Sequence, residues 1–169
     1  MRTERYSPLL DWKVLFVKPR CEKKLAEYCL RNGIGFYLPM REQVRVVQRQ
    51  KRKAILPLFP GYVFTTFPRE GRTKLLQSHM VARILEPPRT SELARSLVMI
   101  RRALAAAPEL TPEPKLVKGM KVKIVSGPFM GIEGIVEKSI SKVRVVLNIE
   151  MIGQSVSVSA EADQLEIAE

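Results

Sequence analysis

The sequence predicts an α+β protein, in which a mixed N-terminal domain is followed by a small all-β domain. In residues 1–107, aromatic and β-branched runs alternate with stretches of helical periodicity. Residues 108–117 are rich in proline, and residues 118–169 are dense in valine, isoleucine and glycine. These shifts in composition give the predicted organisation: an N-terminal domain over 1–107, a linker over 108–117 and a β domain over 118–169.

The first elements of the N-terminal domain follow from local patterns. Residues 12–17 are aromatic and β-branched, which predicts a buried strand. Apolar residues then recur at helical spacing between residues 20 and 31, and an Asn-Gly pair ends that helix. Residues 36–39 predict a second short strand.

A basic hairpin and four further elements complete this domain. Residues 44–56 alternate between Val or Ile and basic or amide side chains, which predicts an exposed β-hairpin with its turn near Gln50-Lys51. The elements expected after it are a strand at 62–67, a helix at 72–79, a strand at 81–85 and a helix after Pro87-Pro88, with Thr90 or Ser91 as the N-cap and Leu93, Leu97, Val98, Ile100 and Leu104 as its apolar stripe.

The C-terminal segment has the pattern of a small closed β-barrel. Short Val- and Ile-rich runs between residues 120 and 158 are punctuated by glycines. This composition favours strands over helices, so we expect a barrel in the free protein. The prolines before it predict an extended linker that does not pack, and therefore a tethered domain.

Charge is distributed very unevenly along the chain. Residues 1–107 hold 22 Lys/Arg and 8 Asp/Glu, whereas residues 108–169 hold 7 Lys/Arg and 9 Asp/Glu. A positive domain attracts nucleic acid. The alternative is a solvated basic surface that aids solubility.

The sequence offers no pattern for catalysis, metal binding or a cofactor. His79 is the single histidine, there is no Cys-x-x-Cys, and acidic residues in the basic half are scattered. Cys21 and Cys29 lie two helical turns apart, too far for a disulfide, and are expected to be small buried residues. No apolar run reaches the roughly 18 residues of a membrane helix, and no signal peptide is visible, so we expect a cytoplasmic protein.

Several short motifs occur in a fixed order over about residues 11 to 167. They are Trp12 at the head of a strand, Lys18 before a helix that opens with Glu22-Lys23-Lys24, the strand Phe36-Tyr37-Leu38-Pro39, the segment Phe59-Pro60-Gly61-Tyr62, and Lys118–Ile124 leading into Gly127–Val136. Together they resemble the NusG family of transcription elongation factors. The resemblance implies an NGN-type N-terminal domain, with an antiparallel or mixed sheet and flanking helices, and an SH3-like KOW β-barrel.

What the resemblance implies about function is non-enzymatic binding by a monomer. The N-terminal domain of the family binds the clamp helices of the largest subunit of bacterial RNA polymerase through an apolar patch. It bridges to the second-largest subunit and lies beside the non-template DNA strand. The KOW domain recruits a ribosomal protein or a termination factor. The expected outcome is suppression of pausing or termination.

The resemblance assigns residues to each contact. The polymerase-binding residues are Phe59, Pro60, Gly61, Tyr62 and Trp12, and the second polymerase contact is Arg72, Thr73 and Lys74. The nucleic-acid-binding residues are Lys18, Arg20, Lys24, Arg49, Lys51, Arg52 and Lys53. The KOW motif residues are Gly119, Gly127, Pro128, Phe129, Gly131 and Gly134.

Other interpretations remain open for some of these residues. Phe59 and Tyr62 are either sheet core or interface, and the family pattern favours the interface for at least one of them. Core burial is the favoured alternative for Trp12. The hairpin is either a contact with DNA or polymerase, or a solvated tip.

Two further alternatives concern the protein as a whole. The turn Ile149–Gln154 departs from the general factor, and the basic hairpin is similar to specialised paralogues that act as operon-selective antiterminators. We therefore interpret the chain as such a paralogue. The alternative class is a KOW-containing ribosomal or RNA-processing protein.

Overall fold

A computed structural model of the chain describes residues 11–114, 119, 121–138, 143–149, 152–160 and 164–168. This part is a mixed α/β structure with antiparallel sheets and three helices, which confirms the predicted mixture of helices and antiparallel sheet. The chain divides into two compact units, Met1–Pro39 with Phe59–Arg95, and Met40–Leu58 with Ser96–Glu169. The division groups the hairpin with the C-terminal sheet; the boundaries 1–107, 108–117 and 118–169 stay a prediction.

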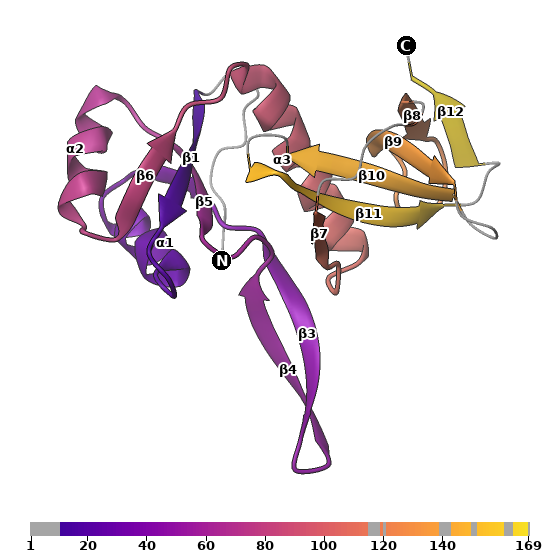
Figure 1. The fold of residues 1–169 in the computed structure, drawn as a ribbon, viewed down its shortest axis with the longest axis horizontal. Helices are drawn as coiled ribbons and strands as arrows, with labels where there is room; N and C mark the ends of the chain where they lie inside the picture. The colour runs from indigo at the N-terminus through magenta and orange to yellow at the C-terminus, as the bar shows by residue number, and fades with distance from the viewer. Residues whose placement is uncertain are drawn as a thin grey trace. The chain divides into compact units, whose positions relative to one another are not determined.

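The first unit is built on a four-stranded antiparallel sheet (Figure 1). Its order is β2 (Gly35–Tyr37), β5 (Tyr62–Thr66), β1 (Trp12–Val17) and β6 (Val81–Leu85). β1 lies between β5 and β6, which explains why most of its side chains are buried. Each of these strands is predicted from the sequence to within two residues.

A side-chain hydrogen bond links two helices of the first unit. Helix α1 (Glu22–Arg31) buries Leu25 and Cys29, as the apolar spacing predicts. Its Tyr28 hydroxyl donates to the carbonyl of Lys74 in α2 (Arg69–Gln77), at 2.9 Å.

Helix α2 begins and ends earlier than the predicted 72–79. It starts directly after Pro68, whose fixed φ suits a helix start. It ends before His79, because His79 has a φ of +57°, outside the helical region.

Helix α3 (Thr90–Ala106) runs through both units. Leu93, Leu97 and Ile100 of the predicted stripe are buried, whereas Val98 and Leu104 are half-buried. Thr90 is the first residue of the helix rather than the residue before it. Its hydroxyl donates to Asp11 Oδ1 at 3.2 Å.

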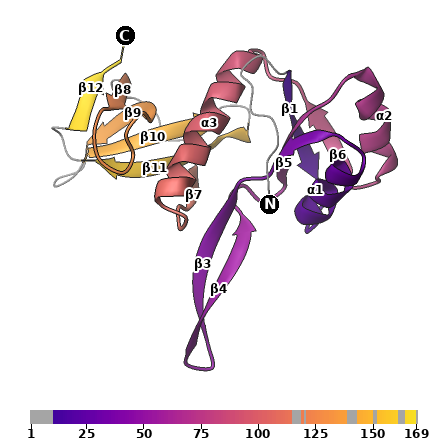
Figure 2. The same cartoon turned by 180° about the vertical axis from the view of Figure 1, so that it is seen from behind.

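The hairpin pairs β3 (Met40–Val47) with β4 (Gln50–Pro57), and no third strand pairs with it among the described residues (Figures 1 and 2). The turn consists of Gln48 and Arg49, two residues before the predicted position. Both have positive φ, +50° and +63°. A two-residue turn of this kind matches the right-handed twist of paired strands, which fixes Val47 opposite Gln50.

Among the described residues, the C-terminal sheet has six antiparallel strands in the order β12-β8-β9-β10-β11-β7. Their bounds are β7 Pro112–Pro114, β8 Lys121–Ile124, β9 Glu133–Lys138, β10 Val143–Ile149, β11 Gln154–Ala160 and β12 Leu165–Ile167. The expectation of strands rather than helices is therefore confirmed for the described residues. No pairing among them joins the edge strands β12 and β7, so a closed barrel is not confirmed.

β7 corrects the interpretation of the proline-rich segment. Pro112 to Pro114 pair with Val156 to Gln154 of β11, so residues 112–114 are part of the sheet and not an unpacked linker. Proline lacks an N–H donor and is therefore tolerated only at the edge of a sheet, which is where β7 lies. Residues 115–118 lie outside the described part.

Candidate functional site

Two hydrogen bonds join Gly61, in the turn that leads into β5, to distant parts of the chain. The Gly61 N–H donates to Glu22 Oε1 at 2.8 Å, and the Gly61 carbonyl accepts from the Val17 N–H at 2.8 Å. Gly61 has a φ of +88°, a region that glycine adopts without steric cost. A Cβ on Gly61 would lie 3.3 Å from Cε2 of Phe16. Glycine therefore allows both the turn and the position of the Phe16 ring.

Phe16 and Tyr62 form an aromatic pair at the surface beside this turn. They are direct cross-strand partners in β1 and β5, and their ring centroids lie 5.4 Å apart with planes inclined at 48°. Phe16 is 42% exposed and Tyr62 is half-buried. Aromatic side chains are enriched at protein interfaces. We refer to Phe16 and Tyr62 as the aromatic pair.

Phe59 and Trp12 lie in the core instead. Each is 1% exposed. The rings of Phe59 and Phe64 meet edge-on, with their centroids 6.4 Å apart. A side chain without exposed surface cannot contact a partner, so Phe59 is not part of the candidate binding surface. For Trp12, the alternative of core burial is confirmed. Tyr62 is the member of the predicted aromatic patch that reaches the surface, next to the exposed Pro60.

Sequence reasoning missed two residues of this site, Phe16 and Glu22. Phe16 is an aromatic residue inside a run that is otherwise core, and its exposure becomes visible only from its register opposite Tyr62. Glu22 carries a weak signal, since it is an acid in the first turn of a helix. Its bond to Gly61 spans 39 residues of sequence, so nothing local indicates it.

Basic residues surround the start of α1. Lys18, Arg20 and Lys24 are all exposed, and Arg20 has a φ of +63°. The Lys18 N–H donates to the Met80 carbonyl at 2.9 Å, which ties the segment between β1 and α1 to the residue before β6. Exposed cations next to a helix start suit phosphate groups. The structure thus leaves these three predicted residues accessible.

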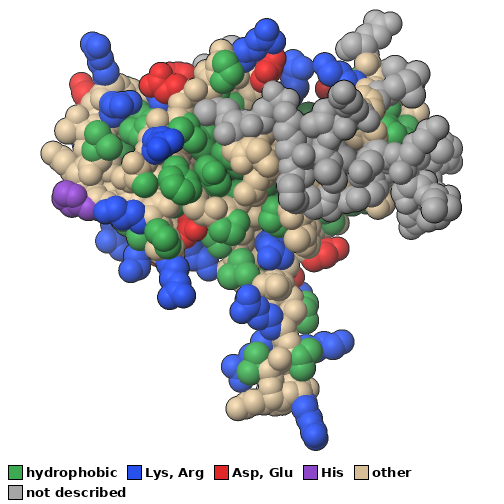
Figure 3. Space-filling model, viewed as in Figure 1, with side chains coloured by type: hydrophobic (Ala, Val, Ile, Leu, Met, Phe, Trp, Pro, Cys, Tyr) green, Lys and Arg blue, Asp and Glu red, His purple; other side chains and the backbone are tan. Residues whose placement is uncertain are grey.

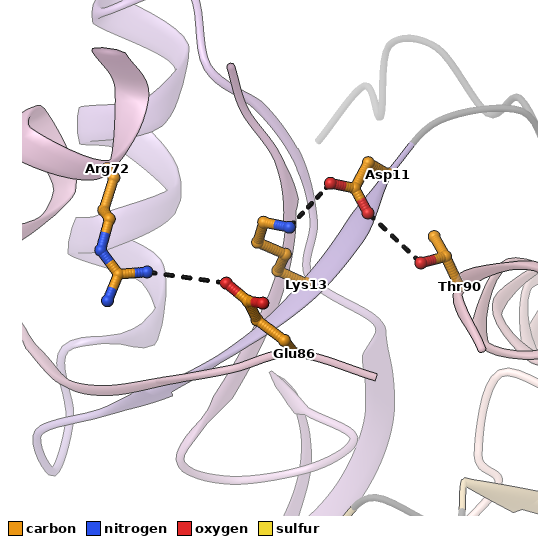
Figure 4. A network of polar contacts seen from close by, with 5 residues as sticks. All are labelled: Asp11, Lys13, Arg72, Glu86 and Thr90. Carbon is orange, nitrogen blue, oxygen red and sulfur yellow. Dashed lines mark hydrogen bonds and ion pairs between the residues drawn. The ribbon is translucent and has the colours of Figure 1, made fainter. Parts of the chain in front are cut away.

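The predicted second contact lies on α2. Arg72, Thr73 and Lys74 are exposed there, and Arg72 lies 3.7 Å from Glu86 Oε1 in an exposed ion pair (Figure 4).

A small polar network lies at the start of β1. Asp11 receives hydrogen bonds from Lys13 and Thr90 (Figure 4). Lys13, as donor and neighbouring charge, is the main reason why the pKa of Asp11 is lowered; Thr90 contributes less.

The hairpin register separates the predicted basic run onto two faces. Arg45 lies directly opposite Arg52, and Arg41 shares their face because successive side chains alternate along a strand. We call Arg41, Arg45 and Arg52 the guanidinium face. Arg49 lies in the turn.

The opposite face combines lysines with aliphatic residues. Lys51 lies opposite Val46, and Lys53 opposite Val44. Lys53 Nζ forms an ion pair with Glu42 Oε2 at 3.0 Å. We call Lys51 and Lys53 the lysine face. Figure 3 shows Lys and Arg side chains (blue) along the hairpin, with apolar side chains (green) between them.

The turn between β8 and β9 contains most of the predicted KOW residues. Gly127 and Gly131 have φ values of +82° and +87°, which favour glycine at both ends of the turn. The Met130 N–H donates to the Gly127 carbonyl at 3.1 Å, and the Gly131 N–H donates to that of Ile124 at 2.7 Å. Met130 is 65% exposed at this turn.

The other KOW residues lie close by. Pro128 is exposed and Phe129 half-buried in the same turn. Gly134 lies opposite Val122 in the β8–β9 pair, and a Cβ on Gly119 would collide with the Val136 carbonyl. The Ile149–Gln154 turn lies partly outside the described residues.

Neither a metal site nor a membrane span occurs in the described part of the chain. Within it, no three or more His, Cys, Asp or Glu side chains come close enough to hold a metal ion. None of the described helices has the length and apolar character needed to cross a membrane.

Comparisons with known proteins extend these observations. Residues 10–101 match the family described as "Transcription termination factor nusG". The chain is 26% identical over 136 residues to the "Transcription termination/antitermination protein NusG" of Pseudomonas aeruginosa, which covers 76% of this chain and 77% of that protein. A solved structure titled "Domain interaction in Thermotoga maritima NusG" aligns with 94% of this chain and 97% of its own, at 20% identity and a TM-score of 0.47.

The described residues form a basic, mixed α/β protein. Its candidate contact surfaces are the aromatic pair, the basic surfaces of α1 and α2, and the hairpin. The family match spans more than half of the 169 residues. The chain therefore belongs to the NusG family of transcription factors.

Proposed function

We propose that this protein binds bacterial RNA polymerase through the aromatic pair and acts as an elongation and antitermination factor. The observation that carries the proposal is the ring contact between the exposed Phe16 and the half-buried Tyr62 beside the Gly61 turn, within the residues that match the family. Aromatic anchors dominate many protein interfaces. The clamp helices of the largest subunit are the proposed partner of this surface.

Two further surfaces of the first unit have proposed partners. Arg72, Thr73 and Lys74 are exposed on α2 and are proposed to contact the second-largest polymerase subunit. Lys18, Arg20 and Lys24 are proposed to contact the non-template DNA strand, since exposed cations beside a strand of phosphates gain favourable electrostatic energy.

The C-terminal sheet is proposed to be a KOW domain that recruits a second partner, a ribosomal protein or a termination factor. Its support is the glycine turn at residues 127–131, which presents the exposed Met130. We also propose that the protein is a specialised paralogue that works as a cytoplasmic monomer.

The binding experiment compares two double variants. In Phe16→Ala/Tyr62→Ala, the loss of two aromatic side chains should weaken polymerase binding by about 2 kcal/mol or more, about 30-fold in Kd. The matched control is Leu30→Ala/Met130→Ala, which removes exposed apolar side chains elsewhere and should bind as the wild type does. If the aromatic variant stays folded and binds polymerase unchanged, the proposed interface is wrong.

The activity experiment is transcription by purified bacterial polymerase on a template with a pause and a terminator. Wild-type protein should shorten the pause and raise readthrough, and the aromatic variant should do neither. An increase in termination would identify a termination factor instead. Binding to ribosomal subunits without binding to polymerase would favour the alternative class, a ribosomal or RNA-processing protein.

A further inference from the structure

The β3–β4 hairpin is a two-stranded ribbon with a high density of positive charge. Residues 40–57 contain six Lys or Arg and a single acid, Glu42. The ribbon pairs with no third strand in the described part of the chain (Figure 2). At its base, the Glu42 N–H donates to the Pro108 carbonyl at 2.7 Å. The exposed strand residues 44–47 and 50–53 flank the turn.

The two faces differ in how their charges are satisfied. Glu42 neutralises Lys53 on the lysine face at 3.0 Å. Arg41, Arg45 and Arg52 have no ion-pair partner among the described residues, although Arg45 Nε donates a hydrogen bond to the uncharged Gln43 Oε1 at 3.2 Å. The guanidinium face is therefore the less compensated side of the ribbon.

Arg45 and Arg52 form an unfavourable pair in the free protein. Directly opposed residues of antiparallel strands have Cβ atoms about 5 Å apart, and like charges at such positions repel. A polyanion placed over this face removes the repulsion, because each guanidinium then faces a phosphate. The arrangement costs stability without a ligand and gains it with one.

The residue types of the hairpin discriminate between kinds of nucleic acid. Proteins that hold single strands generally stack bases on aromatic rings, and residues 40–57 contain no Phe, Tyr or Trp. Contact with the sugar-phosphate backbone needs only cations, and a double helix presents that backbone in a regular array. The hairpin therefore suits a duplex better than a single strand.

Dimensions favour B-form DNA over duplex RNA. Four residues along a strand span about 13 Å, so Arg41 and Arg45 are separated by about the width of the B-DNA major groove, which is roughly 12 Å. That groove admits a two-stranded β-ribbon, whereas the major groove of A-form RNA is too deep and narrow for side chains to enter.

We propose that the guanidinium face of the hairpin binds the phosphate backbone of double-stranded DNA, with the ribbon lying in or along the major groove. Arg45 and Arg52 make the central contacts, Arg41 extends them toward the base of the hairpin and Arg49 extends them at the turn. The lysine face is directed away from the DNA. This inference deepens the nucleic-acid part of the proposed function and does not depend on polymerase binding.

The test uses the full chain, without polymerase, and two charge-matched variants. Arg45→Gln/Arg52→Gln and Lys51→Gln/Lys53→Gln each remove two positive charges, from opposite faces. Binding is measured by fluorescence anisotropy with a labelled DNA duplex, with one of its strands alone, and with an RNA duplex of the same sequence, over a range of salt concentrations.

We expect the arginine variant to weaken duplex DNA binding about tenfold. The slope of log K against log salt concentration should fall by the equivalent of about two phosphate contacts. The lysine variant should weaken binding less than about threefold. Neither variant should lose its fold, since all four residues are exposed. The arginine variant should unfold at a slightly higher denaturant concentration than the wild type, because it removes the repulsion between Arg45 and Arg52. Neither variant should lose the ability to bind polymerase through the aromatic pair, which separates a failure here from a failure of the proposed function.

Three results would overturn the inference. Equal losses in the two variants would mean that the hairpin acts only through diffuse charge. An equal loss for the single strand would remove the preference for a duplex. Tighter binding to the RNA duplex than to the DNA duplex would show that the assigned ligand is wrong.

Discussion

The carboxylate of Glu22 accepts a hydrogen bond from the backbone N–H of Gly61 at 2.8 Å, which joins the first turn of α1 to the turn before β5. Glu22 is 8% exposed, and a carboxylate so far from water needs hydrogen-bond donors. Its place at the positive end of the helix dipole is also favourable. The aromatic pair therefore lies beside a turn that is anchored to the core of the first unit.

Removing the Glu22 carboxylate should loosen the turn. Glu22→Ala leaves the Gly61 N–H without its acceptor, and hydrogen bonds to charged groups contribute roughly 2 kcal/mol. We expect the free energy of unfolding to fall by about that amount in urea denaturation. Glu22→Gln keeps a carbonyl acceptor and should lose less.

Polymerase binding distinguishes this anchoring role from simple stability. Glu22→Ala should weaken polymerase binding, and Glu22→Gln should retain most of it. The side chain at residue 22 does not touch the polymerase in the proposed interface, so any effect on binding acts through the turn. Equal stability of the alanine variant and the wild type would contradict the role of the hydrogen bond.

Gly61→Ala tests the space that the Phe16 ring needs. A positive φ costs a residue with a Cβ roughly 1–2 kcal/mol, and this Cβ would also lie 3.3 Å from the ring. Gly33→Ala is the matched control, because Gly33 has a φ of +67° and a Cβ added there would have nothing within 4 Å. Both variants should lose stability, but only Gly61→Ala should also lose polymerase affinity.

Local periodicity is enough to predict β1, β6 and the buried stripe of α3. Strand β1 (Trp12–Val17) matches the prediction because its aromatic and β-branched run is long and bounded by polar residues. The hairpin turn lies two residues from its predicted position, since Gln48 and Arg49 adopt positive φ without the Asn-Gly signal that usually marks such turns.

Long-range pairing explains most of what the sequence does not reveal. Phe16 is exposed on β1 opposite Tyr62, whereas Phe59 is buried in the turn before β5 with its ring against that of Phe64, and both placements depend on residues distant in the sequence or on the path of the chain. β7 escapes prediction because its prolines indicate a linker, although an edge strand can accept hydrogen bonds without donating them.

Substitution of Arg72 should separate a binding role from a structural one. Its ion pair with Glu86 is 3.7 Å long and both side chains are more than half exposed, so it contributes little to folding. Arg72→Ala should change the free energy of unfolding by less than about 0.5 kcal/mol, yet weaken polymerase binding through loss of the proposed second contact. Glu86→Ala is the control, since it releases Arg72 and should leave binding unchanged or tighter.

Cys29 should make stability fall at alkaline pH. Burial raises the pKa of its thiol to about 12 in the folded protein, from an ordinary value of 9.0. Above pH 9 the unfolded chain therefore loses this proton while the folded protein keeps it, so the free energy of unfolding decreases as pH rises toward 12. Cys29→Ala should show a shallower decrease in urea denaturation, and an unchanged slope would contradict burial of the thiol.

Replacing β7 should expose the edge of β11 that it covers. Pro112 to Pro114 pair with Val156 to Gln154, so glycine at residues 112–114 should weaken the pairing, because three glycines lose more backbone entropy on ordering than two prolines and a glutamate. At least one amide of residues 154–156 should then exchange its hydrogen faster in the full-length protein. Three glycines at residues 109–111, which pair with no strand in the described part, are the control and should leave that exchange unchanged. If both replacements leave residues 154–156 equally protected, β7 contributes nothing to the sheet, and the segment acts as the unpacked linker that its prolines suggest.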